Sequence, residues 1–273
     1  MHFGLYIPPF GDLADPRRLA ALAERAERAG WEGMFLWDHV LHRDVMPIAD
    51  PWVALSAMAC ATSTLRIGAM VTPLARRRPW VVARQAASLD HLSGGRVVFG
   101  VGLGGDGWRE FSAYGEPQAP RLRAERLDEA LAIVVGLWKG VPLRHAGAHF
   151  QIDDVTVLPA PVQQPRIPVW VADVWPHQAP LRRAARYDGV FPIKPGQQFT
   201  PAEIEGLVAE VRAFRVEEGI ANDEPFDVVL TGAADATLAS LASAGVTWWL
   251  ESIDHHRAAA EVERTIDSGP PRA

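Results

Sequence analysis

Cysteine and long apolar runs are both scarce in this chain of 273 residues. Its one cysteine, Cys60, excludes an intramolecular disulfide and is typical of a reducing compartment. The sequence has no run of about 18 apolar residues, which a membrane-spanning helix requires, and it does not start with the segments of a secretory leader. We therefore expect a cytoplasmic protein that is not held in a membrane, with Cys60 in its core.

Positive charge is scarce as well. The chain has 27 Lys and Arg against 33 Asp and Glu, which gives a formal net charge of −6. Proteins that bind nucleic acids or anionic membranes usually carry the opposite excess, so we expect neither partner. Hydrophobic residues make up 48% of the chain, enough for a large core. The length suits two small domains or one α/β barrel.

Short apolar runs alternate with helical patterns along the chain. Several helices are predicted to begin at a capping residue followed by proline, as at Asp15-Pro16, Asp50-Pro51 and Thr200-Pro201. The expected strands are 3–7, 34–37, 65–71, 97–99, 168–172, 189–193, 226–230 and 247–250. The expected helices are 16–29, 52–62, 79–92, 121–139, 176–187, 200–219, 236–244 and 257–266.

This alternation predicts the fold. Parallel strands need crossover connections, and helices supply them here. Eight such units predict a single (β/α)8 TIM barrel, formed by one domain over residues 1–273. The rhythm breaks at about 140–166, where prolines surround the short apolar runs 150–152 and 155–158. We interpret this segment as an irregular excursion with one or two short strands.

In such a barrel the functional site lies at the C-terminal ends of the strands. The segment 92–106, LSGGRVVFGVGLGGD, holds a buried strand followed by Gly100, Gly102, Gly104, Gly105 and Asp106. Its glycines match G-x-G-x-x-G, but no helix-forming sequence follows directly, as a dinucleotide-binding unit requires. A purely structural glycine turn is a second alternative. We favour a strand end that faces a ligand.

Several segments together resemble the luciferase-like monooxygenase superfamily, whose members use FMN or the deazaflavin F420. They are GWEGMFLWDHV (30–40), DPWVALSAMACAT (50–62), 65–106 and WPHQAPLRRAARYDGVF (175–191). The resemblance implies an oxidoreductase that performs hydride transfer or monooxygenation on a small organic substrate at the barrel mouth. It also implies a homodimer, and a separate flavin or F420 reductase is a candidate partner.

The resemblance assigns roles to individual residues. His39 lies where the family has a histidine beside the ring or substrate, and Asp106 replaces a glutamate found in some F420-dependent dehydrogenases. The cofactor would be held by the third strand, often through a non-proline cis peptide, by the fourth, and by the end of the fifth. These positions are Met70, Val71, Thr72, Gly102, Gly104, Gly105, Ala172 and Asp173.

The chemistry of the residues refines these roles. A histidine titrates near neutral pH, which suits His39 to proton transfer, and we expect the adjacent Asp38 to orient it. Asp173 stands where many members carry glycines that hold a phosphate, and it would repel one. The arginines Arg182, Arg183 and Arg186 in the helix that follows are candidates to compensate with positive charge. The run of Arg76, Arg77 and Arg78 is expected to meet the anionic tail of F420, which favours F420 over FMN.

Two other functions stay open. One is a non-catalytic or degenerate flavin-binding member, given the change at Ala172 and Asp173. The less favoured one is a metal-dependent hydrolase barrel that uses Asp38, His39, His42, His255 and His256; the favoured interpretation includes no metal. Trp37, Trp108 and Trp175 are candidate pocket walls, and the apolar helices 52–62 and 79–92 are the candidate dimer surface.

Overall fold

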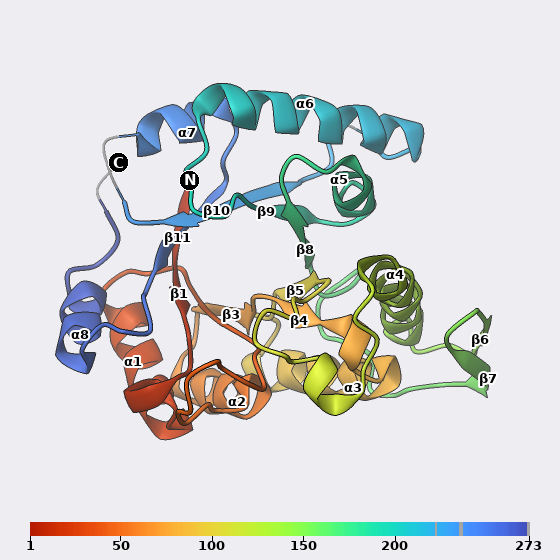
Figure 1. Ribbon diagram of the computed structural model, residues 1–273, viewed down its shortest axis with the longest axis horizontal. Helices are drawn as coiled ribbons and strands as arrows, with labels where there is room; N and C mark the ends of the chain where they lie inside the picture. The colour runs from red at the N-terminus through yellow and green to blue at the C-terminus, as the bar shows by residue number, and fades with distance from the viewer. Residues whose placement is uncertain (222, 235–236, 272–273) are drawn as a thin grey trace.

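The protein forms a parallel barrel surrounded by helices, as the computed structural model shows (Figure 1). The structure describes residues 1–221, 223–234 and 237–271, apart from the side chain of Asp173. The barrel strands are β1 (His2–Ile7), β2 (Gly33–Leu36), β3 (Arg66–Ala69), β4 (Thr72–Pro73), β5 (Phe99–Gly102), β8 (Val169–Val174), β9 (Gly189–Ile193), β10 (Asp227–Gly232) and β11 (Trp248–Ser252).

The strand order is β3-β2-β1-β11-β10-β9-β8-β5-β4, and every pair is parallel. A parallel bridge between Ile67 and Val97 joins the first strand of this order to the segment leading into β5, with Val98 N donating to Ile67 O at 2.9 Å. The short β4 continues β3 beyond a cis peptide bond between Met70 and Val71. Counted as one, β3 and β4 leave the eight strands that the sequence predicts. The barrel prediction is confirmed.

The helices follow the strands around the ring in chain order, as Figure 1 shows. Predicted caps are present: the Asp15 side chain accepts from Arg17 N and that of Asp50 from Val53 N, and Thr200 forms a capping box with Glu203. The α-helices are α1 (Pro16–Arg28), α2 (Pro51–Ala61), α3 (Pro79–Ser93), α4 (Pro120–Leu137), α5 (Gln178–Ala184), α6 (Pro201–Glu217), α7 (Leu238–Ala244) and α8 (Ala259–Asp267). Three 3-10 turns, η1 (Gly11–Leu13), η2 (Leu74–Arg76) and η3 (Ser112–Tyr114), lie in the loops.

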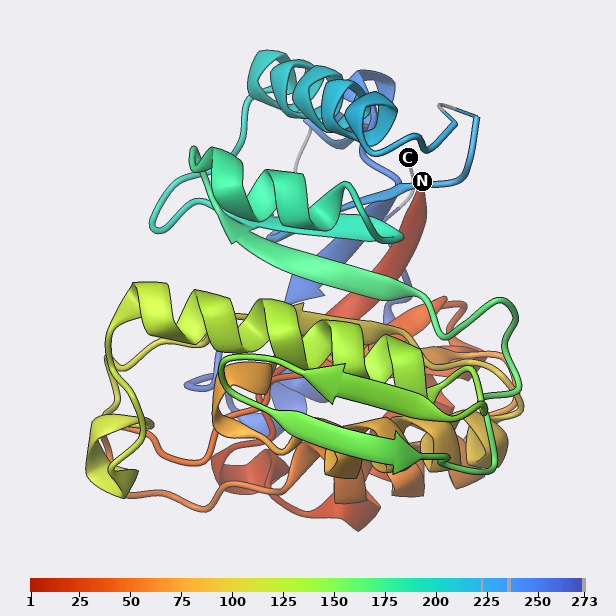
Figure 2. The ribbon, with the colours of Figure 1, turned by 90° about the vertical axis from the view of Figure 1, so that its right-hand side faces the viewer.

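The excursion is an antiparallel hairpin of β6 (Leu143–Ala146) and β7 (Gln151–Val155), which lies beside α4 (Figure 2). The excursion thus holds two short strands, as expected. Of the apolar run 155–158 only Val155 lies in a strand, and the chain then enters a segment with Pro159 and Pro161, which cannot donate to a sheet. One cluster of buried apolar residues runs from Phe3 to Ile266 on the outside of the barrel wall.

The barrel interior is filled by a second cluster, as expected of a packed barrel and not a pore. Its members are Phe35, Met70, Val98, Trp170, Phe191, Val229, Trp248 and Leu250. Four partly exposed residues pack on this cluster: Tyr6, Val71, Ala172 and Ile193. We call these four the floor, because they lie toward the C-terminal halves of their strands or just past the end of β3.

Some predictions about the helices need correction. Helix α5 is shorter than the predicted 176–187, and the predicted start of α7 at residue 236 lies outside the described residues. Cys60 is exposed on α2 and not in the core. None of the described helices combines the length and apolar character needed to cross a membrane.

Candidate active site

His39 lies just past β2 in a group of aromatic rings. Its ring centroid is 4.5 Å from that of Trp108, 5.7 Å from Trp37 and 5.8 Å from Phe10. The side chain keeps 29% exposure, so the imidazole can meet a ligand. Of the predicted walls, Trp37 and Trp108 belong to this group, whereas Trp175 packs against Phe199.

Glu110 is the partner of His39 and was not predicted. Its Oε2 lies 2.7 Å from His39 Nδ1, while its Oε1 accepts from Val40 N at 2.7 Å. Arg76 Nη1 lies 3.1 Å from the same Oε1. Burial opposes the charge of this carboxylate, but His39, Arg76 and the Val40 amide outweigh it and lower the pKa of Glu110. An ionised Glu110 accepts a hydrogen from His39 Nδ1, which leaves Nε2 to act on a ligand.

Asp38 does not orient His39, contrary to our prediction. Its fully buried carboxylate accepts from Arg77 Nη2 at 2.8 and 2.7 Å, and Arg76 Nη2 donates to its main-chain oxygen at 2.8 Å. Successive side chains of an extended segment point to opposite sides, so Asp38 and His39 face different surroundings. Asp38 therefore has a structural role, in which it holds Arg76 and Arg77 in place.

The arginine run is likewise not a joint tail-binding surface. The Arg76 side chain is 6% exposed and lies between Asp38 and Glu110, and Arg77 is held by Asp38. Arg78 stacks on the Trp80 ring at 5.9 Å. Within the described part of the chain, Arg78 alone of the three has no carboxylate partner.

Asp106 holds its own loop together. Its Oδ1 accepts from the amides of Phe111 and Ser112 at 2.8 and 3.0 Å, and these bonds lower the pKa of Asp106. A carboxyl group that stays ionised and is engaged with the backbone is a poor proton donor. The predicted acid role is therefore not supported, and Glu110 is the acidic residue of this loop that reaches His39.

The glycines at the end of β5 serve packing. A Cβ on Gly102 would lie 2.6 Å from Val71 Cγ2, and one on Gly104, whose φ is +69°, would lie 2.8 Å from Pro73 Cβ. Gly105 has no atom within 4 Å of an added Cβ, so its side is open. The structural alternative thus accounts for Gly102 and Gly104, and a contact of any of the three with a ligand stays a prediction. Because β5 lies in a closed barrel, the dinucleotide-binding alternative is wrong.

The sequence matches the family model described as luciferase-like monooxygenase over residues 1–247. The chain belongs to the luciferase-like monooxygenase family.

Two relatives are each 34% identical to this family member. An uncharacterised protein of Mycobacterium bovis aligns over 227 residues, 76% of this chain and 74% of its own length. The F420-dependent hydroxymycolic acid dehydrogenase of Mycobacterium tuberculosis aligns over 178 residues, 62% of this chain and 47% of its own length.

Solved structures with the same fold include an F420-dependent secondary alcohol dehydrogenase in complex with an F420-acetone adduct. It has a TM-score of 0.81 at 18% identity and covers 97% of this chain and 96% of its own. Another is the oxygenating constituent of 3,6-diketocamphane monooxygenase from Pseudomonas putida, in complex with FMN. Its TM-score is 0.69 at 18% identity, and the match covers 86% of this chain and 68% of the monooxygenase chain. At these identities the likeness shows the fold alone.

The residues at the barrel mouth fit a flat ring with a polar edge. The partly exposed floor offers apolar side chains, among them Val71 and Ala172. Trp37 follows β2, Thr72 lies in β4 and Thr231 near the end of β10. Their side-chain atoms Nε1, Oγ1 and Oγ1 are buried and have no hydrogen-bond partner among the described residues. Unpaired buried polar groups cost about 1–3 kcal/mol each, so they favour a ligand that pairs with them. Of the predicted ring-binding residues, Met70 is buried under the floor.

The end of β8 gives less support for a phosphate. Ala172 belongs to the floor, while the side chain of Asp173 lies outside what the structure describes. The three arginines considered as compensation do not supply free charge. Arg182 is bound to Glu217, Arg183 to Asp128 and Arg186 to Glu218.

The metal-dependent hydrolase alternative loses two of its residues. Asp38 is engaged by arginines and His39 by Glu110, so they are not available as ligands. His42 and His255 do lie together, with ring centroids 4.9 Å apart, and His256 stacks on His255 at 3.9 Å.

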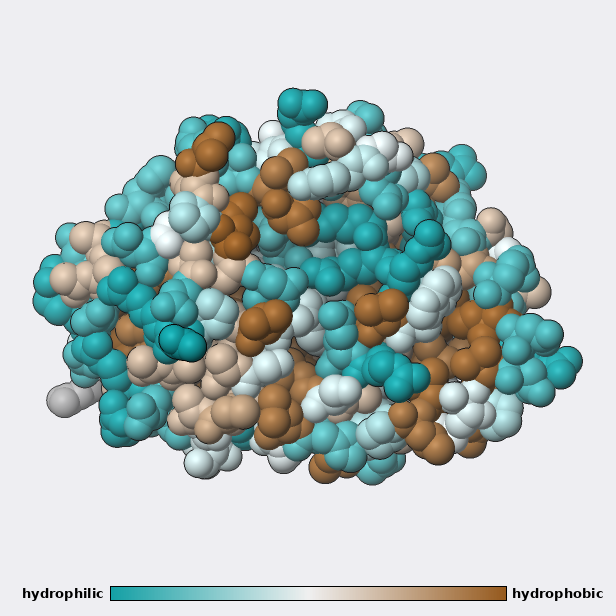
Figure 3. All heavy atoms as spheres, turned by 90° about the horizontal axis from the view of Figure 1, so that it is seen from below, coloured by the Kyte–Doolittle hydropathy of each residue, from teal (hydrophilic) through white to brown (hydrophobic). Residues whose placement is uncertain are grey.

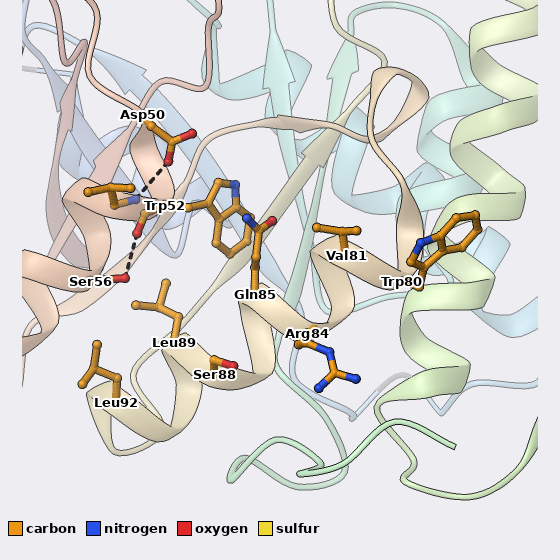
Figure 4. Close-up of a pocket in the computed structure, with 11 residues that line it drawn as sticks. Asp50, Trp52, Ser56, Trp80, Val81, Arg84, Gln85, Ser88, Leu89 and Leu92 are labelled. Carbon is orange, nitrogen blue, oxygen red and sulfur yellow. Dashed lines mark hydrogen bonds between the residues drawn. The ribbon is translucent and has the colours of Figure 1, made fainter. Parts of the chain in front are cut away.

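An apolar groove lies away from this site, between α2 and α3 (Figure 4). It encloses about 610 Å³ and is lined by residues that include Trp52, Val53, Val81 and Leu92. Val53 and Val81 are 59% and 48% exposed. The face seen from below in Figure 3 shows hydrophobic groups among hydrophilic ones.

Proposed function

We propose that this chain is an F420-dependent oxidoreductase that transfers a hydride between the deazaflavin and a small organic substrate at the barrel mouth. The observation that carries the proposal is the His39–Glu110–Arg76 network beside the floor. It places a proton-accepting imidazole next to a surface suited to a flat ring. Alcohol oxidation needs both, because a hydride and a proton leave the substrate together.

The residues divide this task. When bound, the deazaflavin supplies the hydride acceptor. His39 Nε2 takes the hydroxyl proton of the substrate in the oxidation and returns it in the reverse reaction. Glu110 fixes the imidazole through Nδ1 and stabilises the imidazolium. Arg76, held from below by Asp38, keeps Glu110 ionised in its buried position.

The relatives support F420 over FMN, since the named M. tuberculosis relative is an F420-dependent dehydrogenase. The proposed role of the arginine run no longer contributes to this preference. FMN stays the alternative cofactor, because one structural neighbour is a monooxygenase in complex with FMN. A proton-transfer pair at the site favours hydride transfer over monooxygenation.

An anaerobic assay with F420 and simple secondary alcohols, such as 2-propanol and 2-butanol, tests the proposed reaction. Reduction of F420 is followed by the loss of its visible absorbance, in the wild type and in His39→Gln. We expect turnover by the wild type only. Saturable F420 binding without turnover for any alcohol or carbonyl compound tried would favour a non-catalytic member instead.

We further propose that the α2–α3 groove pairs with a second copy of the chain. A barrel's outer helices are normally polar, and the exposed Val53 and Val81 beside Leu92 break this rule. Val53→Glu with Val81→Glu should then yield monomers by light scattering, whereas exchange of the exposed Val45 for Glu should not. A monomeric wild type at micromolar concentration would contradict the proposal. A cytoplasmic location and a separate F420 reductase remain parts of the proposed function.

A further inference from the structure

Two histidines beside the candidate active site each have one ring nitrogen without a hydrogen-bond partner among the described residues. His42 lies in the loop after β2 and His255 in the loop after β11. The Nε2 atoms of both are buried, and neither has a hydrogen-bond partner in the described part of the chain. The His42 side chain is only 1% exposed. A buried polar group without a partner is costly, so this pair is poised for a polar ligand.

The contacts of the two Nδ1 atoms determine whether each Nε2 atom is a hydrogen-bond donor or an acceptor. Asp44 N donates to His42 Nδ1 at 3.1 Å and is nearer to that atom than Asp44 Oδ2, which lies 3.6 Å away, so in the neutral ring the hydrogen of His42 lies on Nε2. Asp254 Oδ1 lies 3.8 Å from His255 Nδ1 and favours a hydrogen on that atom. His42 thus presents a donor and His255 an acceptor.

The surroundings of His255 favour its neutral ring. Burial, together with His256, His42 and Arg43, lowers the pKa of His255, while Asp254 opposes this shift. A neutral imidazole attracts a carboxylate or phosphate weakly. A hydroxyl group is the matching ligand, because it accepts one hydrogen bond and donates another.

The pair is adjacent to His39 and shares its aromatic walls. The Trp108 ring lies 4.3 Å from His42 and 4.5 Å from His39, and the Phe10 ring contacts His39, His42 and His255 at 5.7 to 6.1 Å. A small molecule with one oxygen at His39 would place a second oxygen, a few atoms away, near His42 and His255.

We propose that His42 and His255 form a second oxygen-binding subsite, so that a diol or a hydroxy-carbonyl compound is a better substrate than a simple alcohol. This inference rests on the proposed function for its reacting hydroxyl at His39. The subsite itself can be tested without cofactor.

The test compares 2-butanol with 2,3-butanediol and 1,3-butanediol, which share a carbon chain. Protein labelled with ¹⁵N-histidine is titrated with each compound without F420, and the Nε2 signals of His42 and His255 are followed by NMR. We expect at least one diol to shift both signals at concentrations where 2-butanol does not. No shift with either diol, or equal shifts with 2-butanol, would overturn the proposal.

Variants separate hydrogen bonding from packing. His42→Phe removes the donor, whereas His42→Gln keeps an N–H near the position of Nε2 and should restore much of the preference for the diol. His255→Phe tests the acceptor, and carries the test if His42→Phe fails to fold. His177→Phe, an exposed histidine whose side chain forms no hydrogen bond among the described residues, is the control. An unchanged diol preference in His42→Phe and His255→Phe would overturn the subsite.

The same variants with F420 report on turnover. We expect His42→Phe to raise KM for the diol by a larger factor than it raises KM for 2-butanol. If the chain fails to bind F420 while the diol still shifts both histidine signals, the proposed function falls and the subsite stands. If F420 binds and is turned over but the diol shifts neither histidine signal, the subsite falls and the proposed function stands.

Discussion

His39 Nδ1 lies 2.7 Å from Glu110 Oε2, although 71 residues separate the two in the chain. One residue follows β2 and the other lies in the loop after β5, so the closed barrel brings them together. Arg76 binds the same carboxylate, and this makes the histidine, the glutamate and the arginine one unit.

His39→Gln should leave F420 affinity near the wild-type value and lower kcat by about 10²–10⁴-fold, because it removes a general base. Single-turnover reduction of bound F420 measures the chemical step directly. Equal loss of binding and turnover would instead indicate that His39 holds the cofactor.

Glu110→Gln should lower kcat less than His39→Gln does and change its pH dependence. The anion that stabilises the His39 imidazolium is lost, so the pH at which oxidation reaches half its maximum should move to lower values. The pH profile of kcat checks this, since a merely structural loss would lower the whole profile without moving it.

Local sequence patterns predict the fold, but they do not predict the contacts within the site. Buried apolar runs and capped helices depend on neighbours in sequence, which explains why all eight barrel strands were predicted. Glu110 was missed because only tertiary contacts distinguish it from other loop acids; its place between Trp108 and Phe111 was the one weak signal. Asp38 could have been assigned better, since alternation places it opposite His39. Arg76 was expected to meet the tail of F420 together with its neighbours, because η2, which folds it inward, has no sequence signature.

Gly100→Ala should destabilise the barrel by about 1–3 kcal/mol, because its Cβ would lie 2.4 Å from Ala69 O and 2.6 Å from Met70 Sδ. Gly105→Ala is the matched control, since nothing lies within 4 Å of its Cβ. Denaturant unfolding of both variants measures the difference. Equal stability of the two would show that β3 and β5 do not approach as closely as described.

The decrease in the stability of the fold at acidic pH should depend on Glu27. Burial works against its charge, but the amides of Thr64, Leu65 and Ser63 outweigh this and lower the pKa of Glu27 to about 2. Because the folded pKa lies below the unfolded value, the contribution is present above pH 4.5 and is lost as the pH falls toward 2. The free energy of unfolding of the wild type should therefore exceed that of Glu27→Gln above pH 4.5, and this difference should decrease as the pH falls toward 2. A difference that is constant with pH would contradict it.

Titration of the purified protein with F420 and, separately, with FMN tests whether the chain prefers F420 as its cofactor. Fluorescence or calorimetry gives both dissociation constants, with His39→Gln as a variant that should bind like the wild type. We expect saturable binding of F420, tighter than that of FMN, at one cofactor per chain. Tight binding of FMN with no response to F420 would contradict it.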